Sequence, residues 1–320
     1  MKIDNKKFTD NYFHLEPSDN GFIKFNDKSY SGSLKLAATD NSINIINYIN
    51  LEDYLKGVIS KEMPLGVGTA NLEALKSLTI CARTYATLKM KEGKSIFDIF
   101  DDTRDQMYGG KDAESPLSDL AVEETSGMIL NYANEPAVVF YSSTCGGHTA
   151  AAHNVFTKNE YPYLEGVEDG NDPYCKLSTR YEWEEIYSKE VLIDRLVDAA
   201  LLENNSYEFD EIIINDRFDC GRVDELEILL ENMDGEDISV KIYGNDIRGV
   251  LMTGDGKSEL WSTLFDISDE GDKIVIDGNG YGHGVGLCQW GAIYLSQEGW
   301  NYEDILEHYF PGTSIGKLND

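Results

Sequence analysis

Glu62 is the carboxylic acid whose place in the sequence most strongly suggests chemistry. It falls on one stripe of a predicted helix, at helical spacing from three apolar residues. Those residues are Leu51, Leu55 and Val58. Burial on an apolar face raises the pKa of a carboxyl group, which suits a general acid that works near neutral pH. The structural alternative is that Glu62 ends the helix, faces solvent and pairs with Arg83 or Lys61.

Two residue pairs with the same two-residue gap offer ligand types that zinc accepts. They are Cys145 with His148, and Asp172 with Cys175. Two thiolates, an imidazole and a carboxylate suit a closed structural zinc site more than an open catalytic one, and His153 competes as the fourth ligand. The alternatives are a free thiol in a glycine turn beside an unrelated core cysteine, or the catalytic zinc centre of a hydrolase.

A glycine-rich segment, Gly278–Gly291, presents His283, Gln289 and Trp290. It lacks the Lys-Ser/Thr pair and the downstream acidic residue of nucleotide-binding loops, so nucleotide binding is set aside. An aromatic and polar set of this kind suits stacking on a sugar ring and hydrogen-bonding to its hydroxyl groups. The alternative is a tight structural turn with Trp290 in the core.

The composition limits the class of partner. Among 320 residues, 58 are acidic and 27 basic, which gives a formal net charge of −31. This charge argues against nucleic acid and anionic membrane surfaces as partners, whereas a neutral polysaccharide is compatible with it. Simple solubility is the alternative explanation. The five cysteines are odd in number and scattered, unlike a disulfide framework, and Cys81 and Cys220 are interpreted as packing residues.

The elements around Glu62 follow from periodicity. A strand-like pattern covers residues 21–48. Helical periodicity is predicted over 51–63 and again over 71–91, with a turn at Pro64-Leu65-Gly66 between them. Glu62 is therefore expected near the end of the first helix of a helical hairpin.

The remaining chain divides into a strand region, a charged region and the glycine-rich segment. Strands are predicted at 129–132 and 137–142, and the second leads into the loop with Cys145. Residues 179–257 are highly charged and carry no recognisable site. One helix is predicted there near 188–202. The strands predicted there lie near 211–214, 225–230 and 238–243.

Three paired segments together resemble the stage II sporulation protein D family. They are LEDYLKGV at 51–58 with EMP at 62–64, EALK at 73–76 with ARTYA at 82–86, and GHGVG at 282–286 with QWGA at 289–292. The resemblance covers about 21–174 and 277–313, and the charged region matches only loosely. Trp290 departs from the pattern, since relatives often have tyrosine there.

The resemblance implies a lytic transglycosylase of sporulation. Such an enzyme acts during engulfment on peptidoglycan strands stripped of stem peptides, and cleaves the bond from N-acetylmuramic acid to N-acetylglucosamine to leave 1,6-anhydro ends. Glu62 stands at the position of the family's catalytic glutamate, and no cofactor is implied for catalysis. The residues expected to line the groove are Arg83, Tyr141, His283, Gln289 and Trp290, with Arg83 meeting the lactyl carboxylate.

The same resemblance supplies an alternative function and an expected location. Part of the family is described as enhancing a cell-wall amidase, so the alternative is a non-catalytic glycan-binding partner of such an amidase. Engulfment-complex proteins are further expected partners. An extracytoplasmic protein is implied, held to the membrane by an N-terminal segment that this sequence does not include.

The expected architecture is α+β. A mixed sheet core built from both chain ends, 1–178 and 258–320, is expected to carry the helical hairpin with Glu62. Residues 179–257 are expected to form a second, smaller α/β lobe or insertion. Any zinc site is expected to be structural and to hold the loops of Cys145 and Cys175 beside the groove.

Overall fold

The computed structural model describes residues 2–3, 6–7, 12–18, 21–38, 42–93 and 96–318. The chain divides into two compact units: unit 1 is Met1–Val139 with Thr313–Asp320, and unit 2 is Phe140–Gly312. Helices alternate with short strands that form small sheets, so the predicted α+β class is confirmed. These unit boundaries differ from the predicted ones, which placed a core at 1–178 with 258–320 and a lobe at 179–257. The predicted division remains a prediction.

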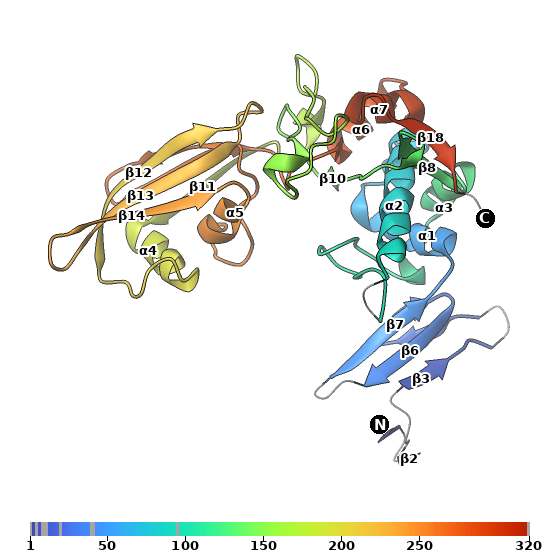
Figure 1. Ribbon diagram of the computed structural model, residues 1–320. Coiled ribbons are helices and arrows are strands. Elements are labelled where there is room, and N and C mark those ends of the chain that lie inside the picture. Colours follow the sequence, from blue (N-terminus) through green and yellow to red (C-terminus); the bar gives the residue numbers. More distant parts are fainter. Residues whose placement is uncertain are drawn as a thin grey trace. The chain divides into compact units, whose positions relative to one another are not determined.

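Unit 1 begins with small antiparallel sheets (Figure 1). Three strands pair in the order β3-β6-β7: β3 (Tyr12–Leu15), β6 (Ser33–Ala38) and β7 (Ile43–Tyr48). Two further pairs are β1 (Lys2–Ile3) with β2 (Lys6–Lys7), and β4 (Ile23–Phe25) with β5 (Lys28–Tyr30). The strand-like pattern over residues 21–48 therefore corresponds to β4–β7.

The predicted helical hairpin around Pro64 is present. Helix α1 (Leu51–Glu62) begins after Asn50, whose side chain accepts the N–H of Glu52 at 2.9 Å, as a good N-cap does. Helix α2 (Leu72–Glu92) follows, and α3 (Pro116–Glu124) packs against both. Helix α3 was not among the elements expected from the sequence; it begins with a capping box and has proline at its start.

The C-terminal strand belongs to unit 1. The sheet order is β18-β8-β9, with β18 (Ser314–Lys317), β8 (Met128–Tyr132) and β9 (Glu135–Pro136). The continuous strand predicted over 137–142 is not formed, since only Glu135–Pro136 and Tyr141–Ser142 are assigned as strands in this stretch. Ala137 and Val139 are buried, so the period of two in the sequence reflects burial without a strand ladder.

Unit 2 contains two three-stranded antiparallel sheets that share one apolar core. One sheet has the order β11-β16-β15: β11 (Glu182–Ser188), β16 (Lys273–Asn279) and β15 (Phe265–Asp269). The other has the order β12-β13-β14: β12 (Tyr207–Arg217), β13 (Val223–Asn232) and β14 (Asp237–Tyr243). Helices α4 (Lys189–Asp198) and α5 (Asp246–Leu251) contribute to the same core.

The rest of unit 2 brings the Cys145 loop to the glycine-rich segment. Strand β10 (Tyr141–Ser142) pairs in parallel with β17 (Leu287–Cys288), which leads directly into α6 (Gln289–Gln297). Helix α7 (Tyr302–Tyr309) and the short 3₁₀ helices η2 (Ala152–Asn154) and η3 (Tyr174–Leu177) complete this part; a further 3₁₀ helix, η1 (Lys111–Ala113), lies in unit 1. Within the described ranges, no helix has both the length and the apolar character needed to span a membrane.

Candidate active site and thiol cluster

Glu62 is the last residue of α1 and lies at the edge of the predicted apolar stripe. Leu55 and Val58, on the same stripe, are fully buried, whereas Glu62 is half-buried. A carboxyl group in this place is partly shielded from water, yet it still reaches the surface of unit 1. Both properties suit an acid that exchanges a proton with a bound molecule.

The Glu62 carboxylate is held by backbone from a distant loop. The N–H of Met107 donates to Oε1 of Glu62 at 2.6 Å. The loop lies against α1, because the N–H of Gly109 donates to the carbonyl of Gly57 at 3.0 Å. A Cβ atom at Gly57 would lie 2.6 Å from the ring of Tyr108, so glycine is what allows this approach. Gly57 in the middle of a predicted helix was the one sequence signal for this contact.

The half-buried Tyr54 lies within electrostatic reach of the Glu62 carboxylate, and the buried Tyr108 lies beside Tyr54. Burial raises the pKa of Tyr54, and the negative charge of Glu62 raises it further. Burial also raises the pKa of Tyr108, so both phenols stay neutral. The Tyr54 hydroxyl donates to Gln106 Oε1 at 3.0 Å, the Tyr108 hydroxyl donates to Asn47 Oδ1 at 2.9 Å, and the two rings are 5.1 Å apart.

An aromatic cavity of about 830 Å³ in unit 1 includes these two tyrosines in its lining. Its other aromatic side chains are Phe25, Tyr30, Tyr48, Phe97 and Phe100. Asparagine, aspartate and arginine side chains share the lining. Flat aromatic faces with interspersed polar groups suit sugar rings, whose faces are apolar and whose edges carry hydroxyl groups.

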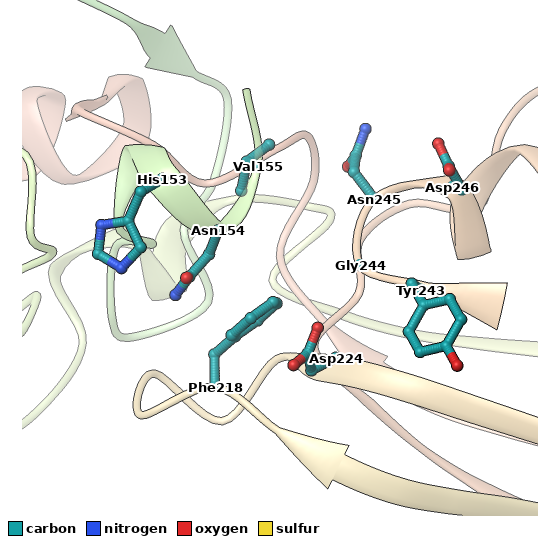
Figure 2. Close-up of a pocket in the computed structure, with 9 residues that line it drawn as sticks. All are labelled: His153, Asn154, Val155, Phe218, Asp224, Tyr243, Gly244, Asn245 and Asp246. Carbon is teal, nitrogen blue, oxygen red and sulfur yellow. The ribbon is translucent and has the colours of Figure 1, made fainter. Parts of the chain in front are cut away.

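A second, shallower hollow of about 350 Å³ lies in unit 2 (Figure 2). His153 and Asp246 lie at opposite ends of it, so these two titratable groups do not converge. His153 instead has its Nδ1 3.7 Å from the carboxylate of Glu165. We therefore do not interpret this hollow as an active site.

Arg83 has a structural environment that differs from the predicted one. It is fully buried, and its guanidinium donates to both carboxylate oxygens of Glu52, at 2.8 and 2.7 Å. It also donates to the carbonyls of Met128 and Val122, at 3.0 and 3.4 Å. The carboxylate partner of Arg83 is thus Glu52 rather than Glu62, and these contacts join α1, α2 and α3 to β8. Groove lining by Arg83 does not follow from this geometry.

His283 lies in unit 2 and binds backbone groups with both ring nitrogens. Its Nε2 is 2.9 Å from the carbonyl of Tyr141, and its Nδ1 accepts the N–H of Val285 at 3.0 Å. Burial, and next the positive charge of Arg248, lower the pKa of His283 to about 3. The neutral imidazole therefore fastens the glycine-rich segment to β10. Tyr141, which was also predicted to line the groove, contacts His283 through its backbone carbonyl.

The glycines of this segment allow close packing. A Cβ atom at Gly284 would lie 2.1 Å from the guanidinium of Arg222, and one at Gly286 would lie 2.2 Å from the carbonyl oxygen of Phe140. Both glycines also have positive φ. These contacts hold the segment against its own unit as in a tight structural turn, but Trp290 is half-buried and not in the core. Gln289 is buried at the start of α6, and the N–H of Trp290 donates to Ser143 at 3.1 Å. Their predicted sugar contacts stay a prediction.

Three thiols and one carboxyl group meet inside unit 2. The ligand atoms of Cys145, Asp169, Cys175 and Cys288 all lie within 4.8 Å of one another, and every one of these residues is fully buried. The sulfur atoms of Cys145 and Cys175 are 3.7 Å apart. Burial, and next the Cys175 thiolate charge, raise the pKa of Asp169 to about 8. We call this group the thiol cluster.

The thiol cluster contains two of the four predicted metal ligands. Cys145 and Cys175 are present, but His148 and Asp172 are not, and Asp169 and Cys288 take their places. His148 Nδ1 lies 2.6 Å from the carbonyl of Thr149, and Asp172 is exposed and pairs with Lys176. Sequence spacing pointed to ligands that are close neighbours in the chain. Cys288 is distant in sequence and lies beside Cys145 because β10 pairs with β17.

Comparison with protein families gives two matches. Residues 39–132, which include Glu62, match a family model described as stage II sporulation protein. Residues 175–286 match a model described as a domain of unknown function, DUF8618. The second match begins at Cys175 and ends at Gly286, so it spans the region for which the sequence pattern indicated no site.

Three curated proteins are similar over most of the chain. An uncharacterized protein of Brachyspira hyodysenteriae is 31% identical over 304 residues, covering 94% of this chain and 76% of the relative. The stage II sporulation protein D of Bacillus subtilis is 29% identical over 290 residues, covering 86% of this chain and 76% of that protein. The amidase enhancer of Bacillus subtilis is 29% identical over 291 residues, covering 82% of this chain and 40% of that protein.

Proposed function

The chain belongs to the stage II sporulation protein D family, and we propose that it is a lytic transglycosylase of the cell wall in sporulation. Its proposed substrate is peptidoglycan whose glycan strands lack stem peptides, and its proposed place is outside the cytoplasm, where that substrate lies. The observation that carries this proposal is the position of Glu62, half-buried at the end of α1 with Oε1 held by Met107.

One carboxyl group is enough for the proposed reaction. The acid form of Glu62 donates its proton to the glycosidic oxygen as the bond from C1 of N-acetylmuramic acid breaks. The resulting carboxylate then takes the proton of the C6 hydroxyl, whose oxygen bonds to C1 and closes the 1,6-anhydro ring. No water is consumed, and Glu62 ends in its starting form. Hydrolytic glycosidases need a second carboxylate at a set distance, which this reaction does not.

The surroundings of Glu62 suit a group that alternates between acid and base. The Met107 N–H fixes one oxygen of the carboxylate, which limits the positions that the carboxyl group samples. The neutral phenols of Tyr54 and Tyr108 add no competing negative charge. The aromatic cavity is lined by both tyrosines but not by Glu62 itself, and it offers stacking faces for sugar rings of the strand beyond the cleaved bond.

A non-catalytic role is the second candidate. It is favoured by one observation, the similarity to a protein named amidase enhancer. In that case unit 1 would bind glycan strands for an amidase partner, and Glu62 would perform no proton transfer. The two candidates therefore differ in what a substitution at Glu62 does.

Strand cleavage and strand binding should be measured in parallel on stem-free glycan strands. We expect Glu62→Gln to lower the rate of fragment release by about 10²–10⁴-fold while strand binding in a sedimentation assay stays within about threefold. The matched control is Glu92→Gln, which changes the exposed glutamate that ends α2. Strand binding by wild type without any release of fragments would contradict catalysis and favour the amidase partner.

A further inference from the structure

We propose that the thiol cluster of Cys145, Asp169, Cys175 and Cys288 binds one divalent metal ion of the zinc class as a closed structural site. This inference concerns unit 2 alone and does not depend on the proposed cleavage reaction. It replaces His148 and Asp172 of the sequence prediction by Asp169 and Cys288. Three soft thiolates with one carboxylate are a ligand set that favours zinc over magnesium or calcium.

The spacing of the ligand atoms matches a tetrahedral site. With zinc–sulfur bonds of about 2.3 Å, two sulfurs of a regular tetrahedron are about 3.8 Å apart. The sulfur atoms of Cys145 and Cys175 are 3.7 Å apart, and the widest separation in the thiol cluster is within 4.8 Å. A disulfide would need a sulfur–sulfur distance of about 2.0 Å. The group is thus arranged for coordination with only small adjustments of the side chains.

Backbone N–H groups already point at the sulfur atoms. The N–H of Cys145 donates to Sγ of Cys288 at 3.2 Å, and the N–H of Gly146 donates to Sγ of Cys175. Such bonds stabilise thiolates over thiols, as second-shell donors do in metal sites. The sequence Cys145-Gly-Gly, with positive φ at both glycines, folds the loop so that its amides can do this.

The carboxylate is oriented in the same manner. The hydroxyl of Tyr309 donates to Oδ1 of Asp169 at 2.5 Å, and the N–H of Cys175 donates to Oδ2 at 2.9 Å. Each carboxylate oxygen has two lone pairs, so one remains on each for a metal. Gly291 makes room for this arrangement, because a Cβ atom there would lie 2.5 Å from Oδ1 of Asp169 and 2.0 Å from the Tyr309 oxygen.

A cation would also offset part of the negative charge of the thiol cluster. Three thiolates and one carboxylate carry four negative charges, of which a divalent metal neutralises two, and the buried guanidinium of Arg222, which donates to the carbonyl of Cys145 at 2.7 Å, adds a nearby positive charge. The two groups that donate to the Asp169 carboxylate, the Tyr309 hydroxyl and the Cys175 N–H, are neutral. Buried carboxylates otherwise pair with cations or coordinate metals, because desolvation of the bare charge is costly.

The site ties together distant parts of the chain. It joins the loop after β10, Asp169, the 3₁₀ helix η3 and the end of β17, and Cys145 and Cys288 are 143 positions apart in the sequence. Four protein ligands without solvent exposure leave no open position for substrate, so the role is structural. Metal binding to such a set in the folded state contributes directly to folding stability.

Metal content of the full chain, purified under reducing conditions without a metal-affinity tag, tests the proposal. We expect about one zinc per wild-type chain. We expect Cys288→Ser and Asp169→Asn to lower the bound zinc at least about tenfold at limiting free metal. Matched controls are Cys220→Ser and Asp172→Asn, which lie outside the thiol cluster and should retain full occupancy, as should His148→Gln.

X-ray absorption of the zinc-loaded wild type gives a second measurement, which does not depend on whether variants fold. We expect three sulfur neighbours and one oxygen. A shell with two sulfurs and nitrogen would overturn the assignment, as would loss of zinc in His148→Gln with retention in Cys288→Ser. A folded, reduced wild type that binds no added zinc, or a Cys145–Cys175 disulfide in place of metal, would also overturn it.

Discussion

At the scale of single residues, His283 shows how an imidazole becomes part of the fold. Its two nitrogens bind the carbonyl of Tyr141 and the N–H of Val285. Protonation would cost the second bond, and both burial and the charge of Arg248 oppose it, so the pKa of His283 is lowered to about 3. In the unfolded chain the same histidine titrates near its ordinary value, about 6.5.

This difference predicts a pH dependence of stability. Between pH 3 and 6.5 the unfolded state binds the proton that the folded state refuses, so stability rises with pH and falls as the solution is acidified. Because the His283 side chain is only half-buried, we expect its contribution to the free energy of unfolding to fall by about 1 kcal/mol or less for each pH unit below 6.5. Between pH 7 and pH 5, the melting temperature of His283→Gln should fall less than that of wild type.

The exposed His14 provides the control for this experiment. His14→Gln should keep the wild-type pH dependence, because His14 lies on the surface of β3. Carboxyl groups that titrate in the same range affect all three proteins equally. Identical slopes for wild type and His283→Gln would contradict the account of His283.

Arg83 and His283 have protein partners that their place in the sequence did not indicate, and their contact with substrate stays a prediction. Both stand in segments that resemble the family's motifs, and both were predicted to meet substrate. Arg83 binds the carboxylate of Glu52, and His283 binds the backbone of Tyr141 and Val285. These partners depend on tertiary contacts, which local sequence patterns do not show. Glu62 could be singled out because its own helix stripe makes a carboxylate unusual.

At the scale of elements, the contact between α1 and the loop of residues 107–110 positions the candidate active site. The loop approaches α1 at Gly57 and delivers the Met107 N–H to Glu62. In an exposed helix interior, glycine to alanine stabilises by up to about 1 kcal/mol. At Gly57 the sign should reverse, because the added methyl group meets Tyr108 and the carbonyl of Gly110 at 2.6 and 2.8 Å.

We therefore predict that Gly57→Ala lowers the free energy of unfolding by about 1–3 kcal/mol. It should also slow strand cleavage more than it weakens strand binding, since it displaces the N–H that holds Glu62. The matched control is Gly249→Ala in α5, where nothing lies within 4 Å of the added atom. Gly249→Ala should be neutral or stabilising. A stabilised, fully active Gly57→Ala variant would contradict the proposed role of the loop.

Elements with strong local signals were predictable, and those shaped by tertiary contacts were not. The helices α1 and α2 follow from apolar periodicity and from the Pro-Gly turn between them. The long strand expected over 137–142 is absent, because alternate burial there occurs without a ladder. The thiol cluster was half predictable, because its members come from segments that only the β10–β17 pairing brings together.

At the scale of the whole molecule, the net charge of −31 bears on substrate choice. Stem peptides add carboxylates to a glycan strand, and stem-free strands lack them, so the chain should repel the former more strongly. We predict that its preference for stem-free strands narrows as salt rises from about 0.02 to about 0.5 M, because screening shortens the range of repulsion.

Binding of both strand types across that salt range checks the prediction. Strands whose stem-peptide carboxyl groups have been amidated serve as the control, and their binding relative to stem-free strands should change little with salt. A preference for stem-free strands that is independent of ionic strength would contradict an electrostatic origin. It would place the discrimination in the shape of the groove instead.

The central claim is that Glu62 cleaves glycan strands without using water. The most direct test is mass spectrometry of the products that wild type forms from stem-free strands in water labelled with heavy oxygen. The account predicts fragments that end in 1,6-anhydro-N-acetylmuramic acid, lighter than hydrolysis products by one water and free of label. Reducing ends that carry the label would contradict it, because they would show that water, rather than the C6 hydroxyl, attacks C1.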